Sequence, residues 1–260
     1  MLVRSWNVYH GNSSPPGRRT YLDEMIALAT ADEPDVVCLQ EVPAWAIGRF
    51  TAGDVAAPPR LGPLPIPAEL GRRLTAAHPG KFRSAFAGQG NAVQVGRRLR
   101  VLRRAVQILN PQPVRAAAAR ALALDVVARL AWAKERRVVQ ALRLRHDDGR
   151  TFLVANMHCT SSRDARLPAV ELERAATFAL AQAEEDDVVV LAGDFNLRGS
   201  NAAVLALTGG RFGFSAPAAG IDHVIVRGAP VSELRVWPPE QRMRSGVLLS
   251  DHTPVEIEIG

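Results

Sequence analysis

The chain has 260 residues, 47% of them hydrophobic and 22% charged, which is an ordinary balance for a globular protein. Its net charge of +6 would suit a polyanionic partner, but the cations are arginines except Lys81 and Lys134. Since that bias can reflect genome composition in an alanine-rich chain, the charge alone does not indicate nucleic-acid binding. Two cysteines, Cys38 and Cys159, argue against a disulfide framework, and the N-terminus has no apolar stretch long enough for a signal peptide or transmembrane segment. We therefore expect a cytoplasmic protein; its oligomeric state cannot be read from the sequence.

Hydrophobic periodicity and turn residues predict elements along the whole chain. In chain order they are a strand over 1–8, a polar loop over 11–17, a helix over 20–31, a buried strand over 36–39, a proline-rich loop over 52–68, a strand over 90–96, a solvated basic loop over 97–104, a helix over 116–135, strands over 138–144 and 151–156, a helix over 169–183, a strand over 188–192 and two last strands over 220–228 and 255–260. Strand–helix alternation followed by strand-rich segments predicts one α/β sandwich domain over 1–260.

Polar side chains recur where the predicted strands end or begin. They are Asn7, His10, Gln40, Glu41, Asn156, His158, Asp194, Asn196, Asp222, His223, Ser250, Asp251 and His252. Each alone is more typical of a turn or a solvated strand end. Because loops converge at one edge of a sheet in layered α/β folds, the ordered set favours a ligand site.

The chemistry of these side chains is that of a hard cation site. Carboxylates and amides with few thiols suit Mg²⁺ or Mn²⁺, and histidines beside the ion can neutralise or protonate a phosphoryl oxygen. Such a site needs no covalent intermediate, because the metal stabilises developing charge while the protein orients a water. The reaction class that fits is phosphoester hydrolysis.

Seven short motifs occur in an order that resembles the endonuclease/exonuclease/phosphatase superfamily, the deoxyribonuclease I-like proteins. They are WNVxHG, LQEV, GNA, NMH, GDFN, IDH and SDH, and they span Asn7 to His252. The resemblance implies a four-layer α/β sandwich of two mixed β-sheets flanked by helices, with the site at one end. It also implies a divalent-metal-dependent phosphoesterase that uses Mg²⁺ or Mn²⁺ on a phosphoester substrate, with nucleic acid among the candidates.

The resemblance also implies a role for each matching residue. Glu41 would be the main metal carboxylate, supported by Asn7 and Asp251. Asp194 would orient or deprotonate the attacking water, with Asn196 beside it. His252, oriented by Asp222, and His158 would face the phosphate, while Asn91 and Arg137 would bind substrate.

Departures from the family pattern leave alternatives open. Tyr9 stands where some nucleases carry an acidic residue, so a second metal site is doubtful, and we expect His10 and His223 to be structural. The predicted helix 116–135 replaces an expected loop with short strands, and it would cover the cleft or contact a partner. Residues 43–80 and 97–135 are expected to determine substrate specificity, but they contain no motif that indicates the substrate. DNA, RNA, inositol phosphates and phospholipids therefore all stay open as substrates.

Two other functions compete with a metal-assisted hydrolase. One is a non-catalytic interaction module on the same fold. The other is a Cys-dependent phosphatase built on Cys159, whose C-x5-R loop would require arginine at the position of Ala165. The sequence therefore disfavours the thiolate mechanism.

Overall fold

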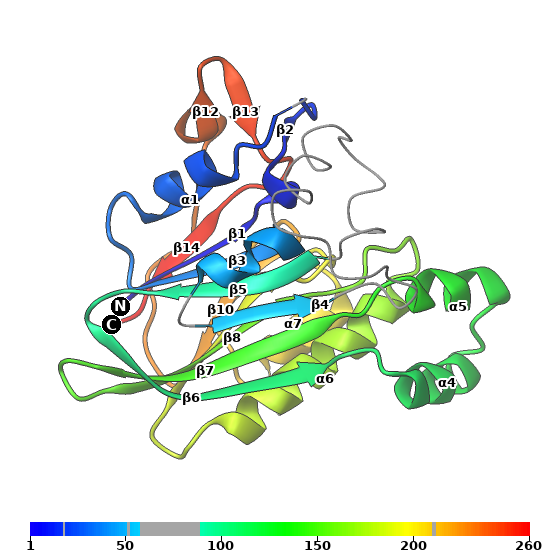
Figure 1. Cartoon of the computed structure of the whole chain (residues 1–260). Helices are drawn as coiled ribbons and strands as arrows, with labels where there is room; N and C mark the ends of the chain where they lie inside the picture. The colour runs from blue at the N-terminus through cyan, green and yellow to red at the C-terminus, as the bar shows by residue number, and fades with distance from the viewer. Residues whose placement is uncertain (18, 51–52, 58–88, 210–211) are drawn as a thin grey trace.

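Two large mixed β-sheets form the centre of the computed structural model, which describes residues 1–17, 19–50, 53–57, 89–209 and 212–260 (Figure 1). The six-stranded sheet has the order β11 (Arg235–Val236), β14 (Val255–Glu258), β1 (Leu2–Asn7), β3 (Val36–Pro43), β5 (Gln89–Val95) and β4 (Gly53–Ala57). The five-stranded sheet has the order β10 (Asp222–Arg227), β9 (Val188–Asp194), β8 (Thr151–His158), β7 (Val138–His146) and β6 (Leu99–Ile108). Each sheet holds one parallel pair, β1 with β3 and β8 with β9.

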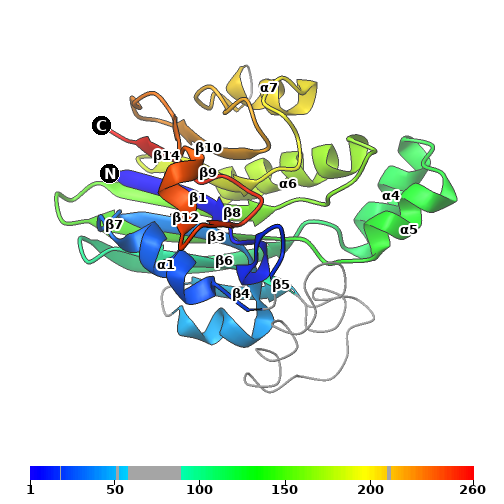
Figure 2. The same cartoon turned by 90° about the horizontal axis from the view of Figure 1, so that it is seen from above.

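Helices cover the outer faces of both sheets, so the predicted four-layer α/β sandwich is confirmed (Figure 2). Helix α1 (Leu22–Thr30) and the 3-10 helix η2 (Ala44–Arg49) pack on the six-stranded sheet in a core that includes Trp6. Helices α6 (Arg166–Gln182) and α7 (Ala202–Thr208) pack on the other sheet. A third core of mainly β-branched and leucine side chains fills the space between the sheets. The central strands are therefore buried on both faces, which explains why their sequences are continuously apolar.

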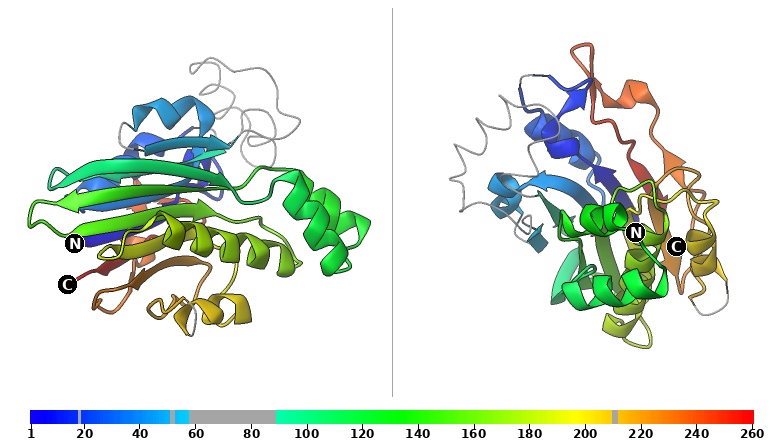
Figure 3. Two further views of the ribbon diagram at one scale, coloured as in Figure 1. Left: turned by 90° about the horizontal axis from the view of Figure 1, so that it is seen from below. Right: turned by 90° about the vertical axis from the view of Figure 1, so that its right-hand side faces the viewer.

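The predicted helix 116–135 is wrong in its continuity. The structure has two helices, α4 (Gln112–Ala121) and α5 (Val126–Ala133), which form a helical hairpin that projects beyond the body of the sandwich (Figure 3). The chain breaks at Ala123, whose φ of 48° is left-handed, and Asp125 then caps α5 by accepting a hydrogen bond from the Ala128 amide. Leu124 is thereby buried against Trp132 and Leu167. Local propensity favours a straight helix, but burial of Leu124 and Trp132 decides the fold-back.

Two further expectations are corrected. The basic segment 97–104 is not a loop, because most of it belongs to β6, an edge strand that pairs with β7 and keeps its arginines at the surface. Within the predicted loop 52–68, residues 53–57 form β4, and the remainder lies outside the described residues.

Short elements also appear in and next to the predicted polar loop 11–17 and in residues 239–249, for which no element was predicted. They are η1 (Tyr9–Gly11), β2 (Ser13–Ser14), η3 (Pro239–Arg242), β12 (Met243–Arg244) and β13 (Val247–Leu249), and β12, β13 and β2 form a small third sheet. The two termini lie side by side, because the Met1 ammonium donates to the Ile259 carbonyl at 2.6 Å (Figure 1). Within the described part of the chain, none of the helices combines the length and apolarity that crossing a bilayer requires.

Candidate active site

The two parallel strand pairs bring their C-terminal ends to one end of the sandwich. Asn7 is in register with Gln40 across β1 and β3, and His158 with Asp194 across β8 and β9. The two sheets are joined there by a buried hydrogen bond of 2.8 Å from Gln40 Nε2 to Asn156 Oδ1. Side chains from strands far apart in sequence therefore meet at this end.

Asp194 lies at the centre of the site and is 1% exposed. Its Oδ2 accepts a hydrogen bond from Asn7 Nδ2 at 3.0 Å, and its Oδ1 accepts one from the Asn196 amide at 2.8 Å. Asn196 has a left-handed φ of 52°, and its side chain donates to the Cys159 carbonyl at 2.9 Å. Burial, and then the charge of Asp222, raise the pKa of Asp194 above its usual range.

Glu41 is aimed into the site by an irregularity in β3. The register with β5 shifts between Leu39 and Val42, and Glu41 has a φ of 54°. Its carboxylate lies 3.1 Å from His10 Nε2 and 3.8 Å from His158 Nε2. Burial works to raise the pKa of Glu41, but these two imidazoles and His252 outweigh it and hold the pKa well below the usual range.

His252 forms a partly buried pair with Asp222. Its Nδ1 lies 2.9 and 3.1 Å from the two Asp222 carboxylate oxygens, while its Nε2 faces Asp194 Oδ2 at 3.8 Å. The loop is held by Ser250, whose hydroxyl donates to the Asn7 carbonyl and accepts from the His252 amide. Burial opposes the charged imidazole, but the hydrogen bond and charge of Asp222 raise the pKa of His252 to about 10.

His158 is held in the opposite protonation state. It is 4% exposed, and Arg137 Nη1 lies 3.1 Å from its Nδ1. Burial, followed by the charge of Arg137, lowers the pKa of His158 well below its usual value. The site therefore contains one neutral and one cationic imidazole, both within 4 Å of Asp194.

Two neighbouring sets of donor atoms could hold a divalent cation. Ligand atoms of Asp194, Asp222 and His252 lie within 4.8 Å of one another. However, Asp222 and His252 already bind each other, whereas Glu41 lines the cleft and, among the described residues, its carboxylate pairs with the imidazoles of His10 and His158. A hard cation suits the Glu41 carboxylate. The set expected from the sequence adds the Asp251 carboxylate and the Asn7 amide oxygen, which in this structure accepts a hydrogen bond from the Tyr9 backbone amide at 2.9 Å.

A cleft of about 180 Å³ opens beside this cluster, and it includes residues that the sequence reasoning missed. It is lined by His10, Glu41, Gln89, Ala131, Lys134, Glu135, Arg137, Thr160 and Ser161. His10 was expected to be structural, yet it contacts Glu41; the signals in the sequence were its place at the end of the first strand and within the WNVxHG motif. Lys134 and Glu135 come from the end of segment 116–135, which was expected to cover the cleft or contact a partner, although neither residue was itself predicted for the site.

Two expected site residues are set apart from the central cluster. Asn91 is 3% exposed, and its side chain donates to the Val138 carbonyl at 3.1 Å, which ties β5 to β7. Asp251 has a side chain 44% exposed and comes no closer to His252 Nε2 than 4.0 Å. Their roles in substrate and metal binding remain predictions.

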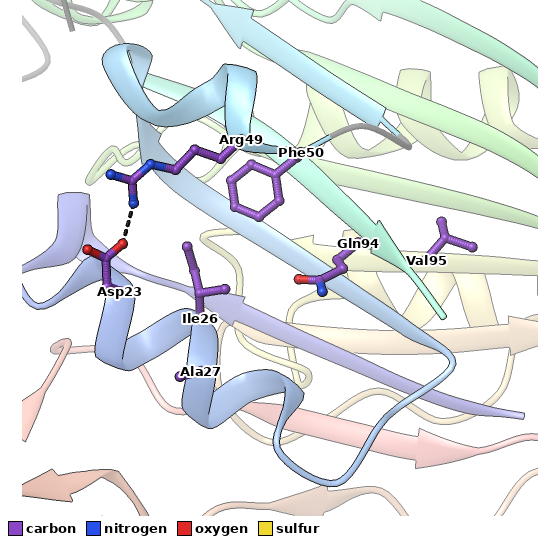
Figure 4. A pocket seen from close by; sticks show the side chains of 7 residues that line it. All are labelled: Asp23, Ile26, Ala27, Arg49, Phe50, Gln94 and Val95. Atoms are coloured by element: carbon purple, nitrogen blue, oxygen red, sulfur yellow. Dashed lines mark hydrogen bonds and ion pairs between the residues drawn. The ribbon is translucent and has the colours of Figure 1, made fainter. Parts of the chain in front are cut away.

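Three other features were candidates for chemistry. Cys159 is fully buried, and burial, with the charges of Glu171 and Asp194, raises the pKa of its thiol well above the usual value, which disfavours a thiolate nucleophile. His223 is buried, bonded to the Leu197 carbonyl and packed on Phe195. A second hollow, of about 450 Å³, lies between α1 and β5, but an Asp23–Arg49 ion pair crosses it and its lining contains none of the predicted site residues (Figure 4).

Comparison with known proteins gives a family and a fold. The sequence pattern of the endonuclease/exonuclease/phosphatase family matches residues 5–252. Comparison with curated proteins finds no match. Danio rerio TDP2 complexed with a single-strand DNA product is 15% identical, with a TM-score of 0.63 and coverage of 99% of this chain and 98% of that chain.

Two other solved structures are comparably similar. The human nocturnin catalytic domain with bound sulfate is 15% identical, with a TM-score of 0.57 over 100% of this chain and 94% of that chain. The mannosyl-6-phosphatase Bt3783 of Bacteroides thetaiotaomicron is 13% identical, with a TM-score of 0.59 over 100% and 99%. At such identities the likeness shows the fold alone.

Proposed function

Because the chain belongs to the endonuclease/exonuclease/phosphatase family, we propose that it is a divalent-metal-dependent phosphoesterase that hydrolyses its substrate with an activated water. One observation carries the proposal. His158 Nε2 lies 3.4 Å from Asp194 and 3.8 Å from Glu41, and His252 Nε2 lies 3.8 Å from Asp194. Four side chains from four separate segments therefore share one cluster beside a cleft.

The residues divide the work of hydrolysis between them. Asp194 is held by Asn7 and by the Asn196 amide, and its raised pKa makes it a stronger base than an exposed aspartate. It would take the proton of the attacking water as oxygen bonds to phosphorus and the leaving-group oxygen departs. Asn196 would orient that water.

The cations of the site would bind the phosphoryl oxygens. The raised pKa of His252 keeps its imidazole charged at neutral pH, so Nε2 can donate to an oxygen that gains negative charge. Arg137 contributes a second, largely buried cation at the cleft. Glu41, Asn7 and Asp251 would hold Mg²⁺ or Mn²⁺, which when bound stabilises the charge on the same oxygens.

The substrate class stays a proposal at the level of a phosphoester. The similar structures include a complex with a DNA product and a mannosyl-6-phosphatase, so the fold does not choose between nucleic acid and smaller substrates. The interaction-module alternative gains no support, because the predicted catalytic and metal-binding side chains are present and lie together. His252 lies beside Asp194 and Asp222, and His158 lies between Asp194 and Glu41.

Hydrolysis of bis(p-nitrophenyl) phosphate tests the proposal. We expect turnover with Mg²⁺ or Mn²⁺ that EDTA abolishes, and a loss of at least about 100-fold in Asp194→Asn and His252→Ala. Asp186→Asn, an exposed aspartate at the start of the loop into β9, is the matched control and should keep full activity. No turnover by folded, metal-loaded protein on this substrate, DNA, RNA, inositol phosphates or sphingomyelin would favour the module instead.

A further inference from the structure

Helix α5 presents an apolar face that is largely exposed to solvent. The three most exposed large apolar side chains of the described chain all lie on it: Val126 is 65% exposed, Val127 75% and Leu130 67%. Val127, Leu130, Ala131 and Lys134 follow the i, i+3, i+4, i+7 spacing of one helix face. We name Val126, Val127 and Leu130 the α5 ridge. Leaving three aliphatic side chains in water is unfavourable, which indicates that something covers the ridge.

The ridge is continuous with the cleft of the candidate active site. Ala131 and Lys134, on the same helix face, line that cleft together with Glu41 and Arg137. A surface that contacts the ridge therefore also lies at the mouth of the cleft. The hairpin that carries the ridge projects from the body of the sandwich (Figure 3).

Buried polar contacts fix the hairpin in this position. Glu171 on α6 is 0% exposed and accepts hydrogen bonds from Trp132 Nε1 at 2.6 Å and from the Thr160 amide at 2.6 Å. Asn110 Nδ2 donates to the Glu135 carbonyl at 2.8 Å, and Asn110 Oδ1 accepts from the Arg137 amide at 2.9 Å. The ridge is thus set rigidly relative to the site.

The charges around the ridge select the partner. Arg120, Arg129, Lys134 and Arg136 are exposed on the hairpin and its C-terminal end, and the exposed acid in this segment is Asp125. A second copy of the chain, meeting the ridge through a two-fold axis, would bring these cations against their own equivalents. A single-stranded nucleic acid would neutralise the cations but needs aromatic faces for its bases, and Trp132, the aromatic residue of α5, is buried.

We propose that the α5 ridge docks the protein on an anionic lipid surface. Aliphatic side chains flanked by arginine and lysine suit the boundary between acyl chains and anionic headgroups, where each part meets its favourable environment. Docking in this way turns the mouth of the cleft toward the bilayer. That any phosphoester is hydrolysed there rests on the proposed function, whereas the docking itself does not.

Sedimentation with vesicles tests the docking. Wild-type protein should sediment with vesicles of phosphatidylcholine mixed with phosphatidylglycerol, more weakly with phosphatidylcholine alone, and less as salt rises. The Val127→Asp/Leu130→Asp variant should lose at least about tenfold in partition coefficient, since two aliphatic anchors become charged. Leu205→Asp, at a 49% exposed position on α7, is the matched control and should bind like wild type. Because the ridge side chains are exposed, both variants should fold, which circular dichroism checks.

Other outcomes overturn the proposal. Equal sedimentation of the wild type and the ridge variant, or no sedimentation of either, refutes lipid docking. A wild-type dimer in light scattering that the ridge variant dissociates, without vesicle binding, assigns the ridge to a second copy. Asp194→Asn should bind vesicles normally, and the ridge variant should hydrolyse soluble bis(p-nitrophenyl) phosphate normally, so the failure of docking and the failure of catalysis give different results.

Discussion

Gly193 is the residue at which the packing of the site is most sensitive to one methyl group. It lies in β9 next to Asp194, is paired with Met157 of β8, and has a φ of 137° that side-chain-bearing residues rarely adopt. A Cβ at this position would lie 1.9 Å from the Met157 carbonyl oxygen. We predict that Gly193→Ala strongly destabilises the fold and separates the strands that carry His158 and Asp194.

The size of the effect follows from two contributions. The backbone strain costs about 1–3 kcal/mol and the steric overlap, which the rigid strand backbone cannot avoid, about 1–3 kcal/mol more. The sum of roughly 2–6 kcal/mol is a large part of the 5–15 kcal/mol that is typical for a domain. If the protein still folds, β8 must move away from β9, so the hydrolysis rate should fall as well.

Two other glycines serve as controls that separate the contributions. Gly149 has a φ of 92° with nothing within 4 Å of the added Cβ, so Gly149→Ala carries backbone strain alone. Gly199 has no left-handed φ, but its Cβ would lie 1.9 Å from the Ala218 carbonyl oxygen, so Gly199→Ala carries overlap alone. Urea unfolding followed by circular dichroism measures all three variants. A Gly193→Ala cost no larger than that of Gly149→Ala would refute the packing argument.

Three further predictions concern protonation, the hairpin and the thiol. In metal-free protein, the pair of His252 with Asp222 contributes its full stabilisation below about pH 6.5, because the pKa of His252 is raised in the folded state. This stabilisation is lost as the pH rises through about 10. Asp222→Asn should lower the pKa of His252 in an NMR titration and should remove the decline in the urea midpoint at high pH. Glu171→Ala should lower the free energy of unfolding by about 3 kcal/mol or more and expose the hairpin around Trp132 to proteolysis, because buried donors lose their acceptor; unchanged cleavage would contradict this role. Cys159→Ser should keep EDTA-sensitive activity, and loss of all activity in folded protein would reinstate the thiolate mechanism.

The sequence by itself determined the central strands and the identity of the polar residues at their ends. Runs such as Val188–Ala192 are apolar and β-branched, so they form strands buried on both faces wherever they are placed. Asn196 favours a turn for local reasons, and the structure has a positive φ there, whereas Gly193, expected to end the strand, lies inside β9 with a φ of 137°. These are short-range preferences, which is why periodicity and turn chemistry were sufficient.

Tertiary structure alone decided how those residues act on each other. The predicted single helix 116–135 breaks into a hairpin because Leu124 and Trp132 gain burial against α6, a contact that no local pattern encodes. His10 meets Glu41, and opposite environments push the pKa values of His158 and His252 apart, through burial and charges brought in from distant strands. Local sequence determines which polar side chains stand at each strand end. Their desolvation and their pairing with other charged groups, which shift their pKa values, arise only once the two sheets have packed together.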